Sequence, residues 1–285
     1  MDGNTLPKKS GITASALKTI ALVTMLIDHL GMTVVYELEQ RYLQNAGVNG
    51  MISAYMRAIG RIAFILYAFL LVEGFVNTSD RRKYVLRLLA GAVISEIPFD
   101  LAGGGKWFDP WDQNIFFTLT IGFCTIWVLE SLKENRYRIG FGFLTVFAGL
   151  LLAEIVRCDY GCMGVGLIVV FYLFRWRSGL LWAVLAETFF GLIIEDMIHY
   201  MIKIYRVFSS RGLDFRVPGL ADLIINVINS ATDRIIYTMP GIIAALLLIM
   251  CYRGEKGRQL PKAFYYLFYP VHLALLYLLM RVIFY

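Results

Sequence analysis

Asp28 and His29 stand side by side near the end of a long apolar stretch, LKTIALVTMLIDHLGMTVV, at residues 17–35. An Asp inside a membrane-spanning helix costs about 2.5–3.5 kcal/mol on insertion scales, so such a residue usually faces the protein interior and marks a functional site. A neutral imidazole can act as a general base near neutral pH, and a nearby carboxylate can fix its tautomer. The pair therefore indicates acid–base chemistry at a site within a membrane.

The periodicity of this stretch predicts which way the pair points. At about 100° per residue, small and polar residues share one arc of a helix and branched apolar residues share the other. Small residues suit close helix packing, and branched ones suit lipid. Neighbours in sequence point about 100° apart, so Asp28 and His29 do not serve each other, and each needs a partner from another helix. The first arc holds Ala21, Thr24, Met25, Asp28, His29, Gly31 and Met32, and the second holds Leu22, Val23, Leu26, Ile27, Leu30 and Val34.

Two of the three histidines, His29 and His272, lie within apolar stretches, and Tyr269 shares the face of His272. Arg61 begins the second stretch, and an arginine can bind a carboxylate or phosphate through two parallel hydrogen bonds. Together with Asp28, these residues predict an acid–base and anion-binding site in the outer half of a membrane. The alternatives stay open, because a membrane histidine is often a packing residue and an arginine can extend to the headgroups.

The composition excludes a soluble domain. The chain of 285 residues is 59% hydrophobic and 17% charged, whereas soluble domains are about 25% charged. The net charge of +6 is typical of basic cytoplasmic loops and does not indicate nucleic acid. The first apolar stretch is long and lacks a small-residue cleavage site, so we interpret it as an anchor rather than a removed signal peptide.

Apolar stretches of about 20 residues predict an all-α polytopic integral membrane protein with about nine transmembrane helices. Most of the basic residues fall in short loops on the N-terminal side, which places the N-terminus in the cytoplasm and the C-terminus outside. We expect a single domain over residues 1–285, with an outer loop at 202–234 whose LADLIINVI segment suits an interfacial helix. The expected spans are 14–35, 61–77, 84–102, 114–132, 139–156, 160–175, 179–201, 235–252 and 264–283.

Several kinds of chemistry lack their motifs. The sequence contains no P-loop, no G-x-S-x-G elbow and no H-E-x-x-H zinc motif, and we predict no metal. Cys158 and Cys162 flank a short turn, C-D-Y-G-C. They could form a disulfide if that turn faces an oxidising compartment, or remain thiols.

A series of segments, taken in order, resembles the TraX family, which is known for N-acetylation of F-pilin and is part of a broader superfamily of membrane-bound acyltransferases. The segments span nearly the whole chain, with residues 200–234 unmatched. They are LKTIALVTMLIDHLGM, RAIGRIAF, FLLVEGFVNT, RRKYVLRLL, ISEIPFD, NIFFTL, DYGCMGV and KAFYYLFYPVHL.

The resemblance implies an acyltransferase that takes an acetyl group from cytosolic acetyl-CoA, its co-substrate. The positions that it carries over are Asp28, His29, Arg61, Asn114, Asp159 and His272. Combining these with the residue analysis, we assign catalysis to His29, Asp28 and His272, and binding of substrate or CoA to Arg61, Asn114, Asp159 and Tyr269.

Our leading hypothesis is an acyltransferase of a bacterial cell membrane, embedded in lipid, with no nucleic-acid partner. The acceptor would be an amine or hydroxyl on a protein N-terminus, a sugar or a small molecule. His29 would be the general base or carry the acyl group, His272 the alternative base or an oxyanion stabiliser, and Asp28 would orient a histidine or pair with Arg61. The alternatives are a proton-coupled transporter or flippase, against which the sequence shows no inverted repeat, and a structural membrane subunit.

Overall fold

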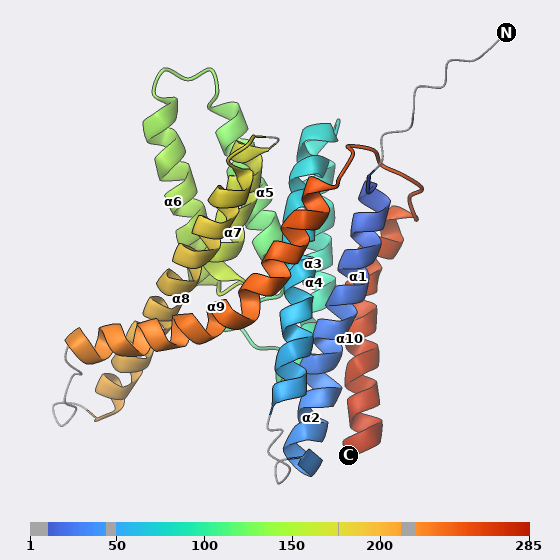
Figure 1. Ribbon diagram of the computed structural model, residues 1–285, viewed down its shortest axis with the longest axis vertical. Coiled ribbons are helices and arrows are strands. Elements are labelled where there is room, and N and C mark those ends of the chain that lie inside the picture. The colour runs from blue at the N-terminus through green and yellow to red at the C-terminus, as the bar shows by residue number, and fades with distance from the viewer. Residues whose placement is uncertain (1–10, 44–49, 176, 212–219) are drawn as a thin grey trace. The chain divides into compact units, whose positions relative to one another are not determined.

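The computed structural model describes residues 11–43, 50–175, 177–211 and 220–285 (Figure 1). Within these ranges the fold is all-α, as predicted, with two isolated backbone bridges and no strand. The helices are α1 (Ala14–Leu30), continued by a π-helical turn (Gly31–Val35), α2 (Tyr36–Leu38) and a second π-helical turn (Glu39–Leu43), then α3 (Met51–Asn77), α4 (Arg81–Gly104), α5 (Ile115–Ser131), α6 (Arg138–Val156), α7 (Gly161–Phe174), α8 (Leu180–Arg211), α9 (Leu220–Met250) and α10 (Lys262–Phe284).

The chain divides into two compact units. Unit 1 comprises Met1–Leu70 and Pro240–Tyr285, and unit 2 comprises Leu71–Met239. The boundaries fall inside two helices, after Leu70 in α3 and at Pro240 in α9. Each unit therefore combines whole helices with parts of the two shared ones.

Five segments of the described chain are long and apolar enough to cross a membrane: Ala14–Leu43, Met51–Asn77, Arg138–Val156, Ile224–Met250 and Lys262–Phe284. Two further helices, α5 and α7, are apolar but shorter, with 17 and 14 residues. Every expected span forms a helix over most of its described length. The count of nine crossings stays a prediction, because α4, α5, α7 and α8 do not combine the length and composition of a span.

Two expected loops are largely helical. The first helix continues to Leu43 and α3 begins at Met51, so little of the expected loop at 36–60 remains. Glu39 explains part of this difference, since its buried carboxylate accepts hydrogen bonds from the N–H groups of Ile52 (2.7 Å) and Ser53 (3.1 Å) and so caps α3. The expected loop at 202–234 is helical over 202–211 and 220–234, and its residues 212–219 lie outside the described chain.

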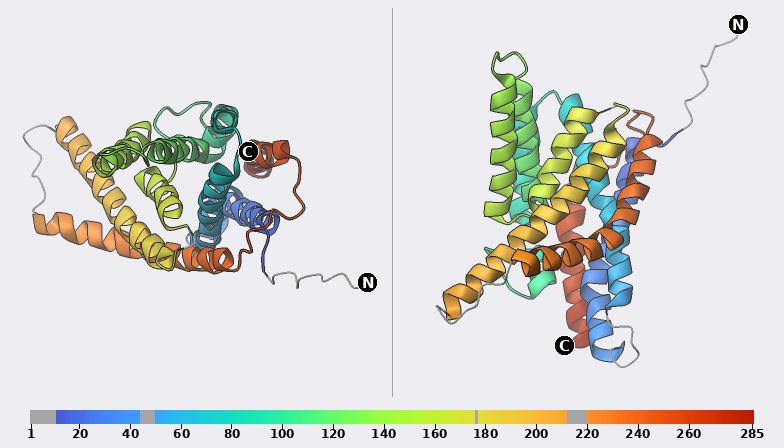
Figure 2. Two further views of the ribbon diagram at one scale, coloured as in Figure 1. Left: turned by 90° about the horizontal axis from the view of Figure 1, so that it is seen from above. Right: turned by 60° about the vertical axis from the view of Figure 1, so that its left-hand side comes forward.

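In unit 1, α1 and α10 run side by side in the same direction (Figures 1 and 2). Three contacts follow them from end to end: Lys18 on the Tyr265 ring, His29 on His272, and Arg41 on the carbonyl of Phe284. From the first contact to the last, the residue numbers increase on both helices, as expected for parallel helices.

Small residues allow α1, α3 and α9 to pack closely in unit 1. A Cβ added at Gly60 of α3 would overlap the Asp28 side chain, and one added at Gly31 would lie 2.7 Å from the Cβ of Met56. On α9, Gly241 lies against the Ala58 carbonyl in the same way. These close approaches set the distance across which polar groups of α1 meet partners on α3.

The burial of α1 follows the expected arcs with one exception. Thr24, Met25 and His29 are buried, and Val23 is about half exposed. Leu22, expected on the lipid side, is also buried, and so is Val34, which lies beyond the end of α1. The buried surface of α1 is therefore wider than the small-residue arc.

Unit 2 is a helical bundle in which α4 packs on α5, α7 packs on α5, α6 and α8, and α5 and α6 form a hairpin (Figure 2). Its aromatic core includes Phe75, Phe123 and Tyr172 in edge-to-face contact. Arg234 of α9 bridges Glu195 and Asp196 of α8 at 2.6 Å each, which ties these two long helices together.

Candidate active site

Two imidazoles form the centre of the site in unit 1. Nδ1 of His29, on α1, lies 2.5 Å from Nε2 of His272, on α10, and the rings stack with centroids 4.8 Å apart. Nδ1 of His272 in turn lies 2.6 Å from the backbone carbonyl of Phe268, one turn earlier in α10. The result is a linear chain of two rings and a carbonyl.

The end of this chain determines which nitrogen atoms carry protons. A carbonyl only accepts, so Nδ1 of His272 must be the donor to Phe268. In a neutral His272 ring, Nε2 is then the acceptor, and Nδ1 of His29 must donate to it. A neutral His29 therefore holds its lone pair on Nε2. No hydrogen-bond partner for this atom is found among the described residues.

Aromatic side chains surround the pair. Tyr269 contacts both rings edge-on, with centroids 5.6 Å from His29 and 5.7 Å from His272, and Phe268 stacks on His272 at 4.9 Å. His29, His272 and Tyr269 are only 8%, 6% and 4% exposed. Bulk water is largely excluded from the pair, which strengthens its hydrogen bonds.

Asp28 finds its partner on α3. Its Oδ1 lies 3.6 Å from Nε of Arg57 in an ion pair, and Arg61 acts on the same carboxylate electrostatically. From the sequence we proposed Arg61 or a histidine as the partner. The structure adds Arg57 to Arg61, because the helices touch at Gly60, opposite Asp28, and both arginines lie within one turn of that contact.

The helix geometry next to the pair was not anticipated from the sequence. The π-helical turn Gly31–Val35 begins two residues after His29, and the Thr33 hydroxyl donates to the His29 carbonyl at 2.6 Å. Such wide turns within α-helices are frequent at functional sites. No sequence signal marks the turn, apart from the small residue Gly31 that opens it.

Asn114, in unit 2, uses both ends of its amide. Its Oδ1 accepts from the N–H of Phe116 (3.0 Å) and caps α5, while its Nδ2 donates to the Ala92 carbonyl (2.8 Å) and to Glu96, both on α4. Asn114 is fully buried. It joins α4 to the start of α5.

Asp159, also in unit 2, lies in a strained turn between α6 and α7. Its N–H donates to the Gln113 carbonyl at 2.8 Å and its carbonyl accepts from the Thr118 hydroxyl. Arg157 and Tyr160, on either side of it, adopt left-handed backbone angles with φ of 58° and 63°. Such angles are uncommon for residues other than glycine, and the hydrogen bonds of the turn hold them in place.

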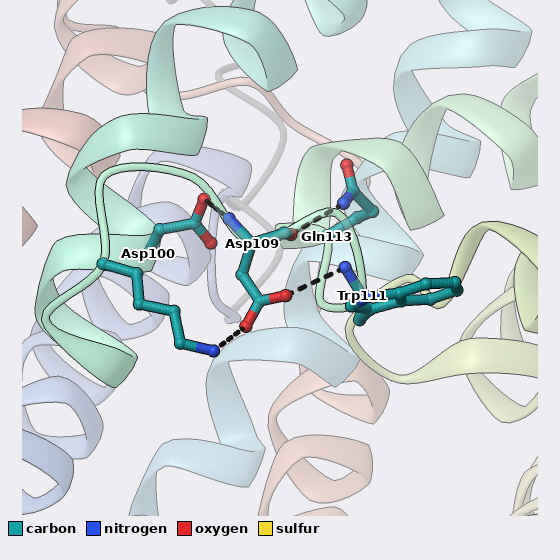
Figure 3. Close-up of polar contacts among 5 residues, drawn as sticks. Asp100, Asp109, Trp111 and Gln113 are labelled. Carbon is teal, nitrogen blue, oxygen red and sulfur yellow. Dashed lines mark hydrogen bonds and ion pairs between the residues drawn. The ribbon is translucent and has the colours of Figure 1, made fainter.

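The loop after α4 closes on an aspartate (Figure 3). The N–H of Asp109 donates to Asp100 (2.8 Å), while its carboxylate accepts from the N–H of Trp111 (3.1 Å) and pairs with Lys106 (2.8 Å). The Lys106 hydrogen bond, followed by that of Trp111, holds the pKa of Asp109 below its usual range.

Cys158 and Cys162 are free, buried thiols in the structure. Burial, with help from nearby carboxylates such as Asp159, raises the pKa of the Cys158 thiol to about 12. This thiol is therefore protonated at neutral pH and a poor nucleophile. Within the described residues, no cluster of three or more His, Cys, Asp or Glu side chains could hold a metal ion.

Comparison with known proteins places the chain in a family. The family model described as TraX protein matches residues 13–280. The probable fimbrial assembly protein FimC, serogroup H1, of Dichelobacter nodosus is 27% identical over 280 residues, which cover 93% of this chain and 94% of that protein. No solved structure matches. Because the family model spans nearly the whole sequence, including both histidines of the pair, the chain belongs to the TraX family.

Proposed function

We propose that this protein is an acyltransferase of a bacterial cell membrane that moves an acetyl or other short acyl group from acyl-CoA to an amine or hydroxyl. The observation that carries the proposal is the open Nε2 of His29, on a histidine pair that is buried between α1 and α10. A fixed tautomer with its lone pair directed away from its hydrogen-bonded neighbour is what a general base needs.

The reaction follows from this geometry. The acceptor amine attacks the thioester carbonyl carbon, forming a C–N bond, and passes a proton to Nε2 of His29. As the C–S bond breaks, that proton goes to the departing sulfur, which leaves as CoA thiol. A protein N-terminus has a pKa of about 7.7–8.0, so near neutral pH a fraction of it is already the neutral amine that can attack the thioester.

Other residues of the site have proposed roles in support. His272 fixes the tautomer of His29 through the hydrogen bond it accepts, and Tyr269 holds both rings in place. The ion pair of Asp28 with Arg57 fixes α1 against α3. Arg61 keeps its proposed role in binding substrate or CoA. For Asn114, whose amide joins α4 to α5 in unit 2, we propose a structural role instead, and the binding role of Asp159 stays a prediction.

The parallel course of α1 and α10 supports an odd number of membrane crossings between the two ends of the chain, as the proposed nine crossings require. With the basic loops in the cytoplasm, both helices would begin on the side where acyl-CoA is found. The relative from D. nodosus is named a probable fimbrial assembly protein. We therefore propose a pilin-type protein as the acceptor.

A proton-coupled transporter fits the same residues less well. A proton relay needs a group at each end that can accept and release protons. The histidine chain ends on the carbonyl of Phe268, which does neither. The geometry thus favours a base with one working nitrogen atom over a relay.

The test uses purified protein in lipid nanodiscs, labelled acetyl-CoA, and membranes of a host strain that lacks the gene as the source of acceptor. His29→Asn keeps a donor near the position of Nδ1 for the bond to His272 but removes the base. We expect both His29→Asn and His29→Ala to lower the rate of label transfer at least about 100-fold. Transfer by both variants at the wild-type rate would refute this mechanism.

A further inference from the structure

The loop between α9 and α10, in unit 1, wraps around the first turn of α1. Its carbonyls at Glu255 and Lys256 accept hydrogen bonds from the N–H groups of Ala14 (2.9 Å) and Ser15 (3.0 Å). The Arg258 carbonyl accepts from the Ser15 hydroxyl. These bonds satisfy N–H groups that a helix end leaves without partners, and they fix the loop in place.

Four cationic residues belong to this fixed loop and to the first turns of the helices beside it: Lys18, Lys256, Arg258 and Lys262. Lys18 donates to Gln259 at 2.6 Å and lies 4.6 Å from the centre of the Tyr265 ring, with Lys256 and Lys262 close enough to repel it. Lys256, Arg258 and Lys262 are exposed. We call these four residues the cationic cluster.

The cluster lacks the carboxylate partners that other cations of unit 1 have. Arg41 pairs with Glu37, Arg57 with Asp28, and Arg253 with Glu255. None of the four cluster residues forms an ion pair within the described chain. Helix α10 also begins here, so the positive end of its dipole adds to the same potential. An arrangement of mutually repelling cations is stabilised by a bound anion.

We propose that the cationic cluster binds the phosphate groups of the acyl-CoA donor, with the thioester extending along α1 and α10 to the histidine pair. This assignment rests on the proposed acyltransferase function and deepens it. It places the phosphate contacts on lysines and an arginine outside the set that the sequence argument assigned to CoA.

The distances along the helices fit this donor. Lys18 precedes His29 by 11 residues and Lys262 precedes His272 by 10, or about 15–17 Å of helix at about 1.5 Å per residue. The pantetheine arm between phosphate and sulfur has the chain length of about four extended residues, roughly 15 Å. A donor held by its phosphates at the cluster would thus present its thioester at the level of His29.

The first experiment compares two donors in nanodiscs of phosphatidylcholine. We expect the double variant Lys256→Ala/Lys262→Ala to raise KM for acetyl-CoA about tenfold, with kcat at saturation within about twofold of wild type. KM for acetyl-pantetheine, which lacks the nucleotide phosphates, should be unchanged. The control is Lys133→Ala, a lysine of another basic loop that pairs with Glu130. An unchanged KM for acetyl-CoA, or an equal rise for both donors, would overturn the assignment.

The second experiment measures binding without turnover, by calorimetry with 3′,5′-adenosine diphosphate. Wild type should bind it and the double variant should bind about tenfold more weakly. Binding of this kind without acetyl transfer would uphold the phosphate site and refute the proposed function. Acetyl transfer with the same KM in wild type and the double variant would uphold the proposed function and refute the phosphate site. If wild type shows neither acetyl transfer nor binding, both are refuted.

A lipid headgroup carries the same phosphate chemistry, so a third arm separates the two sources. Nanodiscs that contain phosphatidylglycerol are compared with pure phosphatidylcholine, and lipid retained by the protein is counted by native mass spectrometry. For a CoA site, retention is equal in wild type and the double variant. If the variant loses phosphatidylglycerol but keeps its affinity for 3′,5′-adenosine diphosphate, the cluster is a lipid site and the proposal is wrong.

Discussion

Each unit buries a polar cluster among apolar helices, but the two clusters use their hydrogen-bonding capacity differently. In unit 1, the chain from His29 through His272 to Phe268 leaves one nitrogen atom, Nε2 of His29, with no partner among the described residues. In unit 2, the amide of Asn114 donates twice and accepts once, and it serves α4 and α5 together. The first arrangement keeps an atom available for chemistry, whereas the second is closed.

This difference separates two kinds of buried polar residue that look alike in sequence. Both stand in apolar surroundings, where a polar group without a partner costs about 1–3 kcal/mol. Asn114 avoids that penalty entirely within the protein. His29 keeps one lone pair without a partner among the described residues, and such exceptions in proteins call for an explanation, a catalytic role among them.

The largest effect should come from removing His272, which accepts the hydrogen bond from Nδ1 of His29. His272→Ala leaves Nδ1 of His29 without an acceptor and its tautomer free, so we expect kcat to fall about 100-fold. His272→Gln keeps an acceptor oxygen near the position of Nε2 and should recover most of that loss. Rates measured across pH 5–9 test the positioning role, because loss of the hydrogen bond to His272 changes the pKa of His29 and so the midpoint of the profile, whereas a structural defect only scales the rate. If the profiles of all three proteins are superimposable apart from scale, His272 does not position His29.

The contact between α1 and α3 should respond to a single methyl group. Gly60→Ala forces a Cβ into the Asp28 side chain, and overpacking of this kind costs about 1–3 kcal/mol. The matched control is Gly140→Ala in α6, where an added Cβ meets nothing within 4 Å and should stabilise by about 0.5–1 kcal/mol. Thermal unfolding followed by size-exclusion chromatography measures both. Equal Tm values for the two variants would contradict the close approach at Gly60.

The helices of unit 1 could be predicted because hydropathy over the length of a bilayer is a local property of the sequence. The arcs of α1 also required partners from other helices for Asp28 and His29, and the structure supplies them from α3 and α10. The ion pair of Asp28 with Arg57, in addition to the effect of Arg61, could not be predicted, because it depends on where two helices touch, at Gly60.

Unit 2 was harder to predict for the same reason. An asparagine directly before an apolar run is a recognisable helix cap, and Asn114 caps α5. Its other partners, Ala92 and Glu96, lie about 20 residues earlier and become neighbours only through folding. For the same reason the sequence did not predict that helices continue beyond the apolar runs. A charged residue such as Glu39 is typical of a loop, but here its side chain is buried and caps α3.

A smaller effect tests whether Asn114 is structural. Asn114→Ala removes the cap of α5 and the donor to Ala92 and Glu96, for an expected loss of about 2 kcal/mol of stability. Asn114→Asp keeps the cap but loses the donor beside a carboxylate, so it separates the two contributions. Tm should fall for both, with KM for acetyl-CoA within about twofold of wild type. A raised KM at unchanged Tm would instead assign Asn114 to substrate binding.

The smallest effect concerns the loop of Figure 3, the exposed counterpart of the closed cluster in unit 2. The pKa of Asp109 is lowered, chiefly by Lys106, so the carboxylate stabilises the loop above the unfolded Asp pKa, about 3.9, and this contribution is lost as pH falls through the folded value. The pKa of Lys106 is raised, chiefly by the hydrogen bond to Asp109. The ammonium therefore stabilises the loop below the unfolded Lys pKa, about 10.4, and this contribution is lost as pH rises through the folded value.

Hydrogen exchange at the Trp111 amide, corrected for the intrinsic effect of pH, measures this loop directly. We expect constant protection between about pH 5 and pH 9 and a decrease below about pH 4, with no change in the Tm of the whole protein near neutral pH, because exposed ion pairs contribute little. Asp109→Asn keeps an acceptor for Trp111 but loses the charge, so its protection should no longer depend on acid. If wild type and this variant lose protection together below pH 4, the carboxylate does not hold the loop. The titration then belongs to another group, such as Asp100, which accepts the Asp109 N–H.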